Sequence, residues 1–137
     1  MSHETRVLRI GIASREMMKA RTIAIARGEH KPGPNEPKVW FASMESLAQV
    51  LSTKNQLLLE LIRRLHPASM KELADISGRK PGNLSRTLRN MERYRLVKLN
   101  KSEEGTIVPE VPYESLTFDL PVAAMAAGLV SQRRPAV

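Results

Sequence analysis

The sequence has 137 residues and a formal net charge of +8 at pH 7, a size that fits one domain with short extensions. It contains no cysteine, which excludes disulfides and thiolate metal sites, and 42% of its residues are hydrophobic, enough to build a core. The basic balance favours a polyanionic partner, with a basic protein that has no such partner as the alternative.

The ends of the sequence show no pattern of a targeting or anchoring segment. The longest uncharged stretch near an end, residues 120–130, is shorter than the roughly 20 residues that a membrane-spanning helix needs. The N-terminus lacks the apolar run and the cleavage site of a signal peptide. We therefore expect a soluble protein of the cytoplasm with no membrane partner.

Residues 1–37 are predicted to form a βα extension. Apolar residues alternate with others along Val7–Ile12, which indicates a short strand. Ser14 is suited to cap a helix that continues to about Arg27. Three prolines within Lys31–Pro37 indicate a connector that separates this extension from the following residues.

The next segment is predicted to be mainly helical. Val39–Phe41 is either a short strand or an anchor to the core, and a short helix covers Met44–Leu51. A longer helix begins at Thr53, which has the spacing of a capping box with Gln56, and ends at Pro67. The apolar stripe expected to be buried on this helix comprises Leu57, Leu58, Leu61, Ile62 and Leu65.

Two further helices are predicted. Ser69 and Glu72 form a second capping box, which opens a helix over Met70–Ser77. Pro81 suits the first position of the next helix, because its missing N–H needs no partner there, and this helix continues to about Tyr94. The side chains expected to face inward from the two helices are those of Met70, Leu73, Ala74, Ile76, Leu84, Leu88 and Met91.

A hairpin is predicted after the last helix. Strands over Leu96–Leu99 and Thr106–Val108 flank a turn-like segment, Asn100–Gly105, and Thr117–Leu120 is a candidate for another strand. The order of helix, helix, turn, helix and hairpin predicts a mainly α fold with a small β-hairpin wing (α+β). We interpret it as a winged helix-turn-helix over residues 38–120, followed by a tail over residues 121–137. The second helix of such a motif enters the major groove of DNA.

Positive charge is concentrated on this motif. Between Arg79 and Lys101 the sequence has eight Lys or Arg residues and one acidic residue, Glu92. A solvated helix face, the alternative, normally mixes both signs. Arginine and asparagine can read guanine and adenine edges, and serine and lysine contact phosphates. The residues predicted to contact double-stranded DNA are Arg79, Lys80, Asn83, Ser85, Arg86, Arg89, Asn90, Arg93 and Lys101, with Arg86 and Arg89 foremost.

The predicted wing has acidic residues at its tip. Glu103 and Glu104 lie in the turn of the hairpin, where they would repel phosphates. We therefore expect weak contact between this wing and DNA, with Lys101 as its candidate phosphate ligand.

Four segments carry a resemblance to a known family: Trp40–Ser52, Asn55–Leu59, Pro67–Ala74 and Gly78–Met91, whose sequence GRKPGNLSRTLRNM is the most specific. Residues 40–100 resemble the MarR-like winged-helix predicted transcriptional regulators, in particular a group of antitoxin-like DNA-binding proteins. The resemblance implies a dimeric DNA-binding regulator that represses its own operon and neutralises a toxin encoded beside it.

One position departs from the pattern of these regulators. They usually have a glycine just before the Leu-Val pair that opens the wing, where this sequence has Arg95. Glycine at that position ends a helix in the left-handed conformation. Either Arg95 is strained in this conformation, for a phosphate contact, or the helix ends differently.

No enzyme, cofactor or metal site is predicted. His3, His30 and His66 are far apart and lack ligand spacing, and no nucleotide-binding or nucleophile-elbow motif is present. One alternative is a protein-interaction module that neutralises a toxin or binds another partner, with only non-specific DNA affinity. RNA binding is another, although exposed aromatic side chains for stacking are missing. Operator symmetry predicts a homodimer, and the βα extension could form its interface or hold a toxin.

Overall fold

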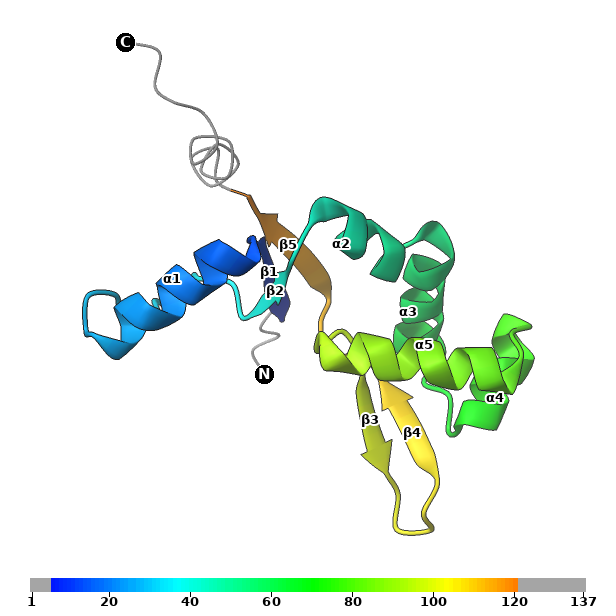
Figure 1. Ribbon diagram of the computed structural model, residues 1–137. Helices are drawn as coiled ribbons and strands as arrows, with labels where there is room; N and C mark the ends of the chain where they lie inside the picture. Colours follow the sequence, from blue (N-terminus) through cyan, green and yellow to red (C-terminus); the bar gives the residue numbers. More distant parts are fainter. Residues whose placement is uncertain (1–5, 121–137) are drawn as a thin grey trace. The chain divides into compact units, whose positions relative to one another are not determined.

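The computed structural model describes residues 6–120, and the chain divides into two compact units (Figure 1). Of the described residues, one unit contains Arg6, Val7 and Ala48–Ser115, and the other contains Leu8–Leu47 and residues 116–120. Within residues 6–120 the elements are five helices and five strands, so the predicted mixture of helix and sheet is confirmed. The predicted tail, residues 121–137, lies outside the described residues.

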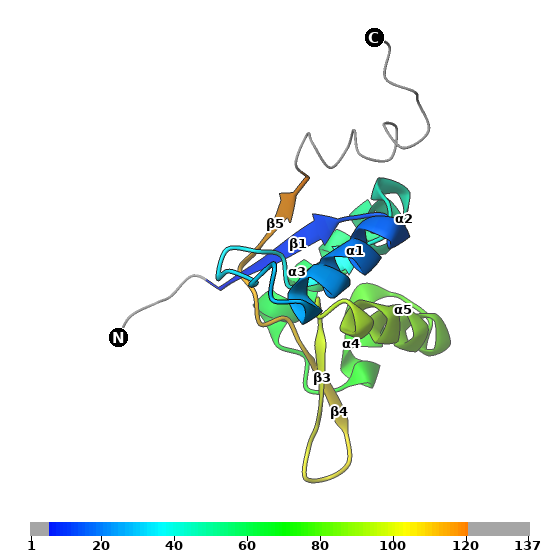
Figure 2. The same ribbon diagram turned by 60° about the vertical axis from the view of Figure 1, so that its left-hand side comes forward.

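The unit that contains Leu8–Leu47 is built on a three-stranded sheet. Strand β1 (Val7–Ile12) and helix α1 (Arg15–Ala26) occur where the sequence predicts them, and the Ser14 hydroxyl accepts the Met17 N–H at 3.2 Å as the helix cap. Strand β2 (Val39–Phe41) pairs with β1 in parallel. Strand β5 (Ser115–Asp119) lies beside β1 (Figure 2) and completes the sheet, in which β1 is the central strand.

The sheet includes strands from both sides of the boundary that the sequence suggested at residue 37, since β1 lies before it and β2 after it. Ile10 lies opposite Val39, and Ile12 opposite Phe41, so β2 pairs with the strand of the βα extension. The physical reason is that parallel neighbours need a long crossover, here α1 and the proline-rich segment, which the sequence presents as a separating linker.

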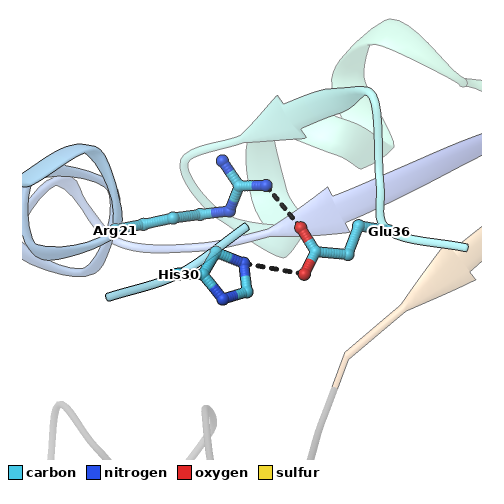
Figure 3. Close-up of polar contacts among 3 residues, drawn as sticks. All are labelled: Arg21, His30 and Glu36. Atoms are coloured by element: carbon cyan, nitrogen blue, oxygen red, sulfur yellow. Dashed lines mark hydrogen bonds and ion pairs between the residues drawn. The ribbon is translucent and has the colours of Figure 1, made fainter. Parts of the chain in front are cut away.

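The proline-rich segment is held in place by side chains. Glu36 accepts a hydrogen bond of 2.6 Å from Arg21 on α1, and its other oxygen lies 2.7 Å from the imidazole of His30 (Figure 3). The Arg21 guanidinium also lies over the Trp40 ring, 5.2 Å from its centre. The hydrogen bond from Arg21 lowers the pKa of Glu36. The residues Lys31–Pro37 are therefore an anchored crossover.

The unit that contains Ala48–Ser115 has four helices in succession, of which the first begins in the other unit. These are α2 (Met44–Val50), α3 (Thr53–Leu65), α4 (Met70–Ser77) and α5 (Pro81–Arg93). No helix within the described part of the chain is long and apolar enough to span a lipid bilayer.

The cap of α3 differs from the prediction. Ser52, not Thr53, caps the helix, and its hydroxyl accepts the Asn55 N–H at 3.3 Å. Gln56 makes no capping box and instead donates to the Leu51 carbonyl at 2.8 Å. Two adjacent hydroxyl residues, Ser52 and Thr53, lie at the start of the helix, and the non-helical backbone of Ser52 makes it the cap.

The burial of α3 and α4 is also narrower than predicted. On α3, Leu58 and Ile62 are each 1% exposed, whereas Leu57 is 56% and Leu65 is 46% exposed. On α4, Leu73 and Ala74 are buried, but Ile76 is exposed. The capping box of α4 is present in outline: Ser69 accepts the Glu72 N–H at 3.0 Å, and the Glu72 carboxylate accepts the Ala68 N–H at 2.8 Å.

The last helix leads into an antiparallel hairpin, β3 (Lys98–Lys101) and β4 (Ile107–Glu110), which projects from α5 in Figure 1. Both strands lie slightly later in the chain than predicted, because Leu96 and Val97 are buried at its base and do not pair. A hydrogen bond of 2.9 Å from the Gly105 N–H to the Ser102 carbonyl stabilises the turn. Gly105 has a φ of 86°, the conformation that a three-residue hairpin loop requires.

Candidate nucleic-acid interface

The orientation of α5 is fixed by its buried face. Leu84, Leu88 and Met91 are each 0% exposed, as the sequence predicts. Pro81 occupies the first position of the helix, where its missing N–H costs nothing. Because the buried residues recur at helical spacing along the whole element, the opposite face of α5 points away from the core along its length.

That outward face carries the amide and guanidinium groups that the sequence singles out. Arg86, Arg89 and Arg93 are exposed, as are Asn83 and Asn90; Ser85 beside them is half-buried. Within residues 6–120 none of the three arginines makes an ion pair or a side-chain hydrogen bond. Their guanidinium groups are therefore available to a ligand. By contrast, the arginines at positions 21, 63 and 64 each pair with a glutamate.

A hollow of about 690 Å³ lies against this face. Arg86, Arg89 and Arg93 line it, and Gln49 at the end of α2 and Asn55 at the start of α3 contribute from the junction of those helices. The sequence analysis did not single out Gln49 or Asn55. No local pattern identifies them, because α5 approaches the α2–α3 junction only through packing between helices far apart in the chain.

Asn55 connects three parts of this unit. Its amide N–H donates to the Val50 carbonyl at 2.9 Å, which ties the end of α2 to the start of α3. Its amide oxygen accepts a hydrogen bond of 3.0 Å from Arg79, and a second guanidinium nitrogen of Arg79 donates to the Lys54 carbonyl at 2.7 Å. Arg79, which lies between α4 and α5, therefore braces the turn against α3, whereas Lys80 beside it is exposed.

The helix ends in the left-handed conformation that the sequence raised as one possibility. Arg95 has a φ of 61°. Its N–H donates to the Glu92 carbonyl at 2.9 Å, and the Leu96 N–H donates to the Met91 carbonyl at 3.0 Å. These two bonds form a Schellman motif, and the buried side chains of Leu96 and Met91 provide its usual apolar pair. An arginine thus occupies a position that favours glycine.

The single acidic residue of the basic segment has a structural partner. The Glu92 carboxylate accepts the backbone N–H of Leu99 at 3.2 Å, which ties β3 to the last turn of α5. This bond directs the carboxylate toward the hairpin, whereas the three arginines point outward. The acid therefore helps to hold the hairpin and does not interrupt the arginine face.

The hairpin itself has both signs of charge. Lys98 and Lys101 on β3 are exposed, and so are Glu103 and Glu104 in the turn, as the sequence suggested. Glu110 on β4 accepts a hydrogen bond of 2.8 Å from the Asn100 amide. The positive face of α5 therefore adjoins a hairpin whose tip is negative.

The described residues contain no group of three or more His, Asp or Glu side chains that could hold a metal ion. His30 contacts Glu36 on the proline-rich segment, and His66 ends α3 in the left-handed conformation. His3 lies outside the described residues. The chemistry of the exposed α5 face is that of hydrogen-bond donors and positive charge.

The chain matches the model of a protein family. Neither the curated proteins nor the solved structures contain a match to this chain. The model of the HVO_A0114 family matches residues 50–118, just over half of the sequence. This range includes helices α3, α4 and α5, the hairpin, and every residue predicted to contact DNA. The chain belongs to the HVO_A0114 family.

Proposed function

We propose that this protein is a sequence-specific regulator of transcription that binds double-stranded DNA. Helices α3, α4 and α5 with the hairpin would form a winged helix-turn-helix, in which α5 enters the major groove. The observation that carries the proposal is the outward face of α5, where Arg86, Arg89 and Arg93 are exposed and unpaired within the described residues.

The dimensions and chemistry of the major groove suit this face. The groove is about 12 Å wide and admits one helix, and its floor presents acceptors that a guanidinium reads in bidentate fashion. Arg86 and Arg89 are positioned on the middle of α5 and are assigned to guanine edges. Asn83 and Asn90 can make the corresponding bidentate bonds to adenine. A single strand of RNA or DNA would call for exposed aromatic side chains on which its bases stack, and the described face of α5 lacks them.

The remaining residues are assigned to the DNA backbone or to positioning. The residues assigned to phosphates lie beside those assigned to base edges or on the hairpin; they are Lys80, Ser85, Arg93 and Lys101. Arg79 is assigned mainly to positioning, because its guanidinium is bonded to Asn55 and to the Lys54 carbonyl. A cytoplasmic location is part of this proposal.

The proposal is tested by binding to labelled duplexes from the region upstream of the gene and to random duplexes across a salt series. Sequence-specific binding predicts tighter affinity for the upstream duplex and a steep fall of affinity with salt. Arg86→Ala and Arg89→Ala are expected to reduce the discrimination by about 1–3 kcal/mol each. Arg15→Ala, an exposed arginine on α1, is the matched control. Equal and weak binding to both duplexes would contradict the proposal.

We further propose, on the sequence resemblance, that the protein represses its own operon and neutralises a toxin encoded beside it. A reporter fused to the upstream region is expected to fall on expression of the wild type and to recover with Arg86→Ala. Co-expression with the neighbouring gene tests the antitoxin function: growth arrest by that gene product alone, relieved by this protein, is the expected result.

A further inference from the structure

The outer side of α3 leaves leucines uncovered. Leu57 is 56% and Leu65 is 46% exposed, and Leu61 between them is half-buried. The spacing of four residues places them along one side of the helix, adjacent to the buried pair Leu58 and Ile62. We call Leu57, Leu61 and Leu65 the leucine stripe.

Outside its buried face, α3 is contacted by the segment after the hairpin on one flank. Arg63 lies on the far flank of the buried pair, as helical spacing requires. It donates a hydrogen bond of 3.3 Å to the Tyr113 carbonyl and pairs with Glu114 at 3.3 Å, so the segment after the hairpin lies against that flank. The leucine stripe, on the opposite flank, has no such cover within the described residues.

The leucine stripe is bordered by one acidic and one basic residue, which can pair with the same two residues of a second copy. Glu60 and Arg64 border it on the solvent side, 61% and 62% exposed, and their side chains lie 3.8 Å apart. When two such helices pack antiparallel about a two-fold axis, equivalent flanks face each other. A two-fold axis level with Ile62, midway between Glu60 and Arg64, then brings Glu60 of each copy toward Arg64 of the other, while the leucine stripes meet.

We propose that the leucine stripe of α3 is the interface through which two copies of this chain form a homodimer. The interface is isologous, because one stripe packs against the same stripe of the second copy, with Glu60 and Arg64 setting the antiparallel direction. This inference does not rest on the proposed DNA binding, and its experiments contain no DNA.

The first test is the mass of the full chain by sedimentation equilibrium over a concentration series. Wild type is expected to be a dimer. Leu57→Glu and Leu65→Glu are each expected to raise the dimer dissociation constant at least about tenfold. Ile107→Glu, which places the same charge on the exposed apolar residue of the hairpin, is the matched control and is expected to leave the constant unchanged. A circular dichroism spectrum and a thermal melt of each variant verify its fold.

A charge exchange tests the direction of packing with variants whose sites are well exposed. Glu60→Arg alone and Arg64→Glu alone are each expected to weaken the dimer, and the double variant to restore it. An equimolar mixture of the two single variants is expected to form a heterodimer. A monomeric wild type would overturn the inference. The stripe would then be covered by another segment of the chain or by a different protein. A dimer that the leucine variants leave intact, or a double variant that stays dissociated, would also overturn it.

Discussion

Replacing Arg95 by glycine is expected to stabilise the fold, because Arg95 ends α5 with a φ of 61°. The left-handed conformation costs an L-residue with a side chain about 1–2 kcal/mol, and glycine avoids this cost. Glycine also gives the unfolded chain more freedom, which offsets about 0.4–1 kcal/mol of the gain. The net increase in the free energy of unfolding is therefore about 1 kcal/mol or slightly less. For a domain of this size, that corresponds to a rise in Tm of roughly 2–6 °C.

The control for this prediction is Arg95→Ala, which removes the same charge but keeps the Cβ atom and hence the strain. Thermal melts of the two variants separate backbone conformation from loss of the guanidinium. Gly78→Ala provides the reverse test, since Gly78 has a φ of 73° and open space around its Cα: a loss of about 1 kcal/mol is expected there. A Tm for Arg95→Gly no higher than that for Arg95→Ala would refute the reasoning.

Gly11→Ala is expected to destabilise the protein by about 1–3 kcal/mol in denaturant titrations, because a Cβ there would lie 2.4 Å from the Trp40 ring. Joint replacement of Glu103 and Glu104 by glutamine should tighten binding to any duplex at low salt, since it removes repulsion from phosphates; unchanged affinity would place the hairpin tip away from DNA. Glu36→Gln tests the anchored crossover. The pKa of Glu36 is lowered from 4.5, so its stabilising effect is present above that pH and is lost as the pH falls through the lowered pKa. The Tm difference between wild type and Glu36→Gln should therefore shrink with acidification, and a constant difference would contradict the assignment.

The elements that the sequence predicts correctly are those set by local signals. Ser14 and Ser69 cap their helices, and Pro81 begins α5, because a side chain near the helix start decides each case. The left-handed conformation of Arg95, one of the two possibilities that the sequence raised, also follows from a local signal, the position directly after α5 where the regulators that the sequence resembles usually have glycine. The inward residues of α5 follow from periodicity alone, and all of them are buried.

The features that the sequence misses depend on contacts between distant segments. β2 has only the residues Val39–Phe41, and its place in the sheet comes from pairing with β1. The exposure of Leu57 reflects one-sided packing of α3, which periodicity cannot reveal. Arg79 belongs to the basic run, but its guanidinium reaches back to Asn55, 24 positions earlier. Gln49 joins the hollow at α5 for the same reason.

The distribution of charge along the chain constrains where a duplex can lie. Residues 79–101 carry eight basic side chains and one acidic one, whereas residues 102–120 carry five acidic side chains and no basic one. The sign changes within the hairpin, between Lys101 at the end of β3 and Glu103 in the turn. Phosphates that lie along α5 in the proposed complex would therefore be repelled at the tip of the hairpin. In the proposed complex the duplex follows α5 and Lys80, and the hairpin orients it chiefly by exclusion.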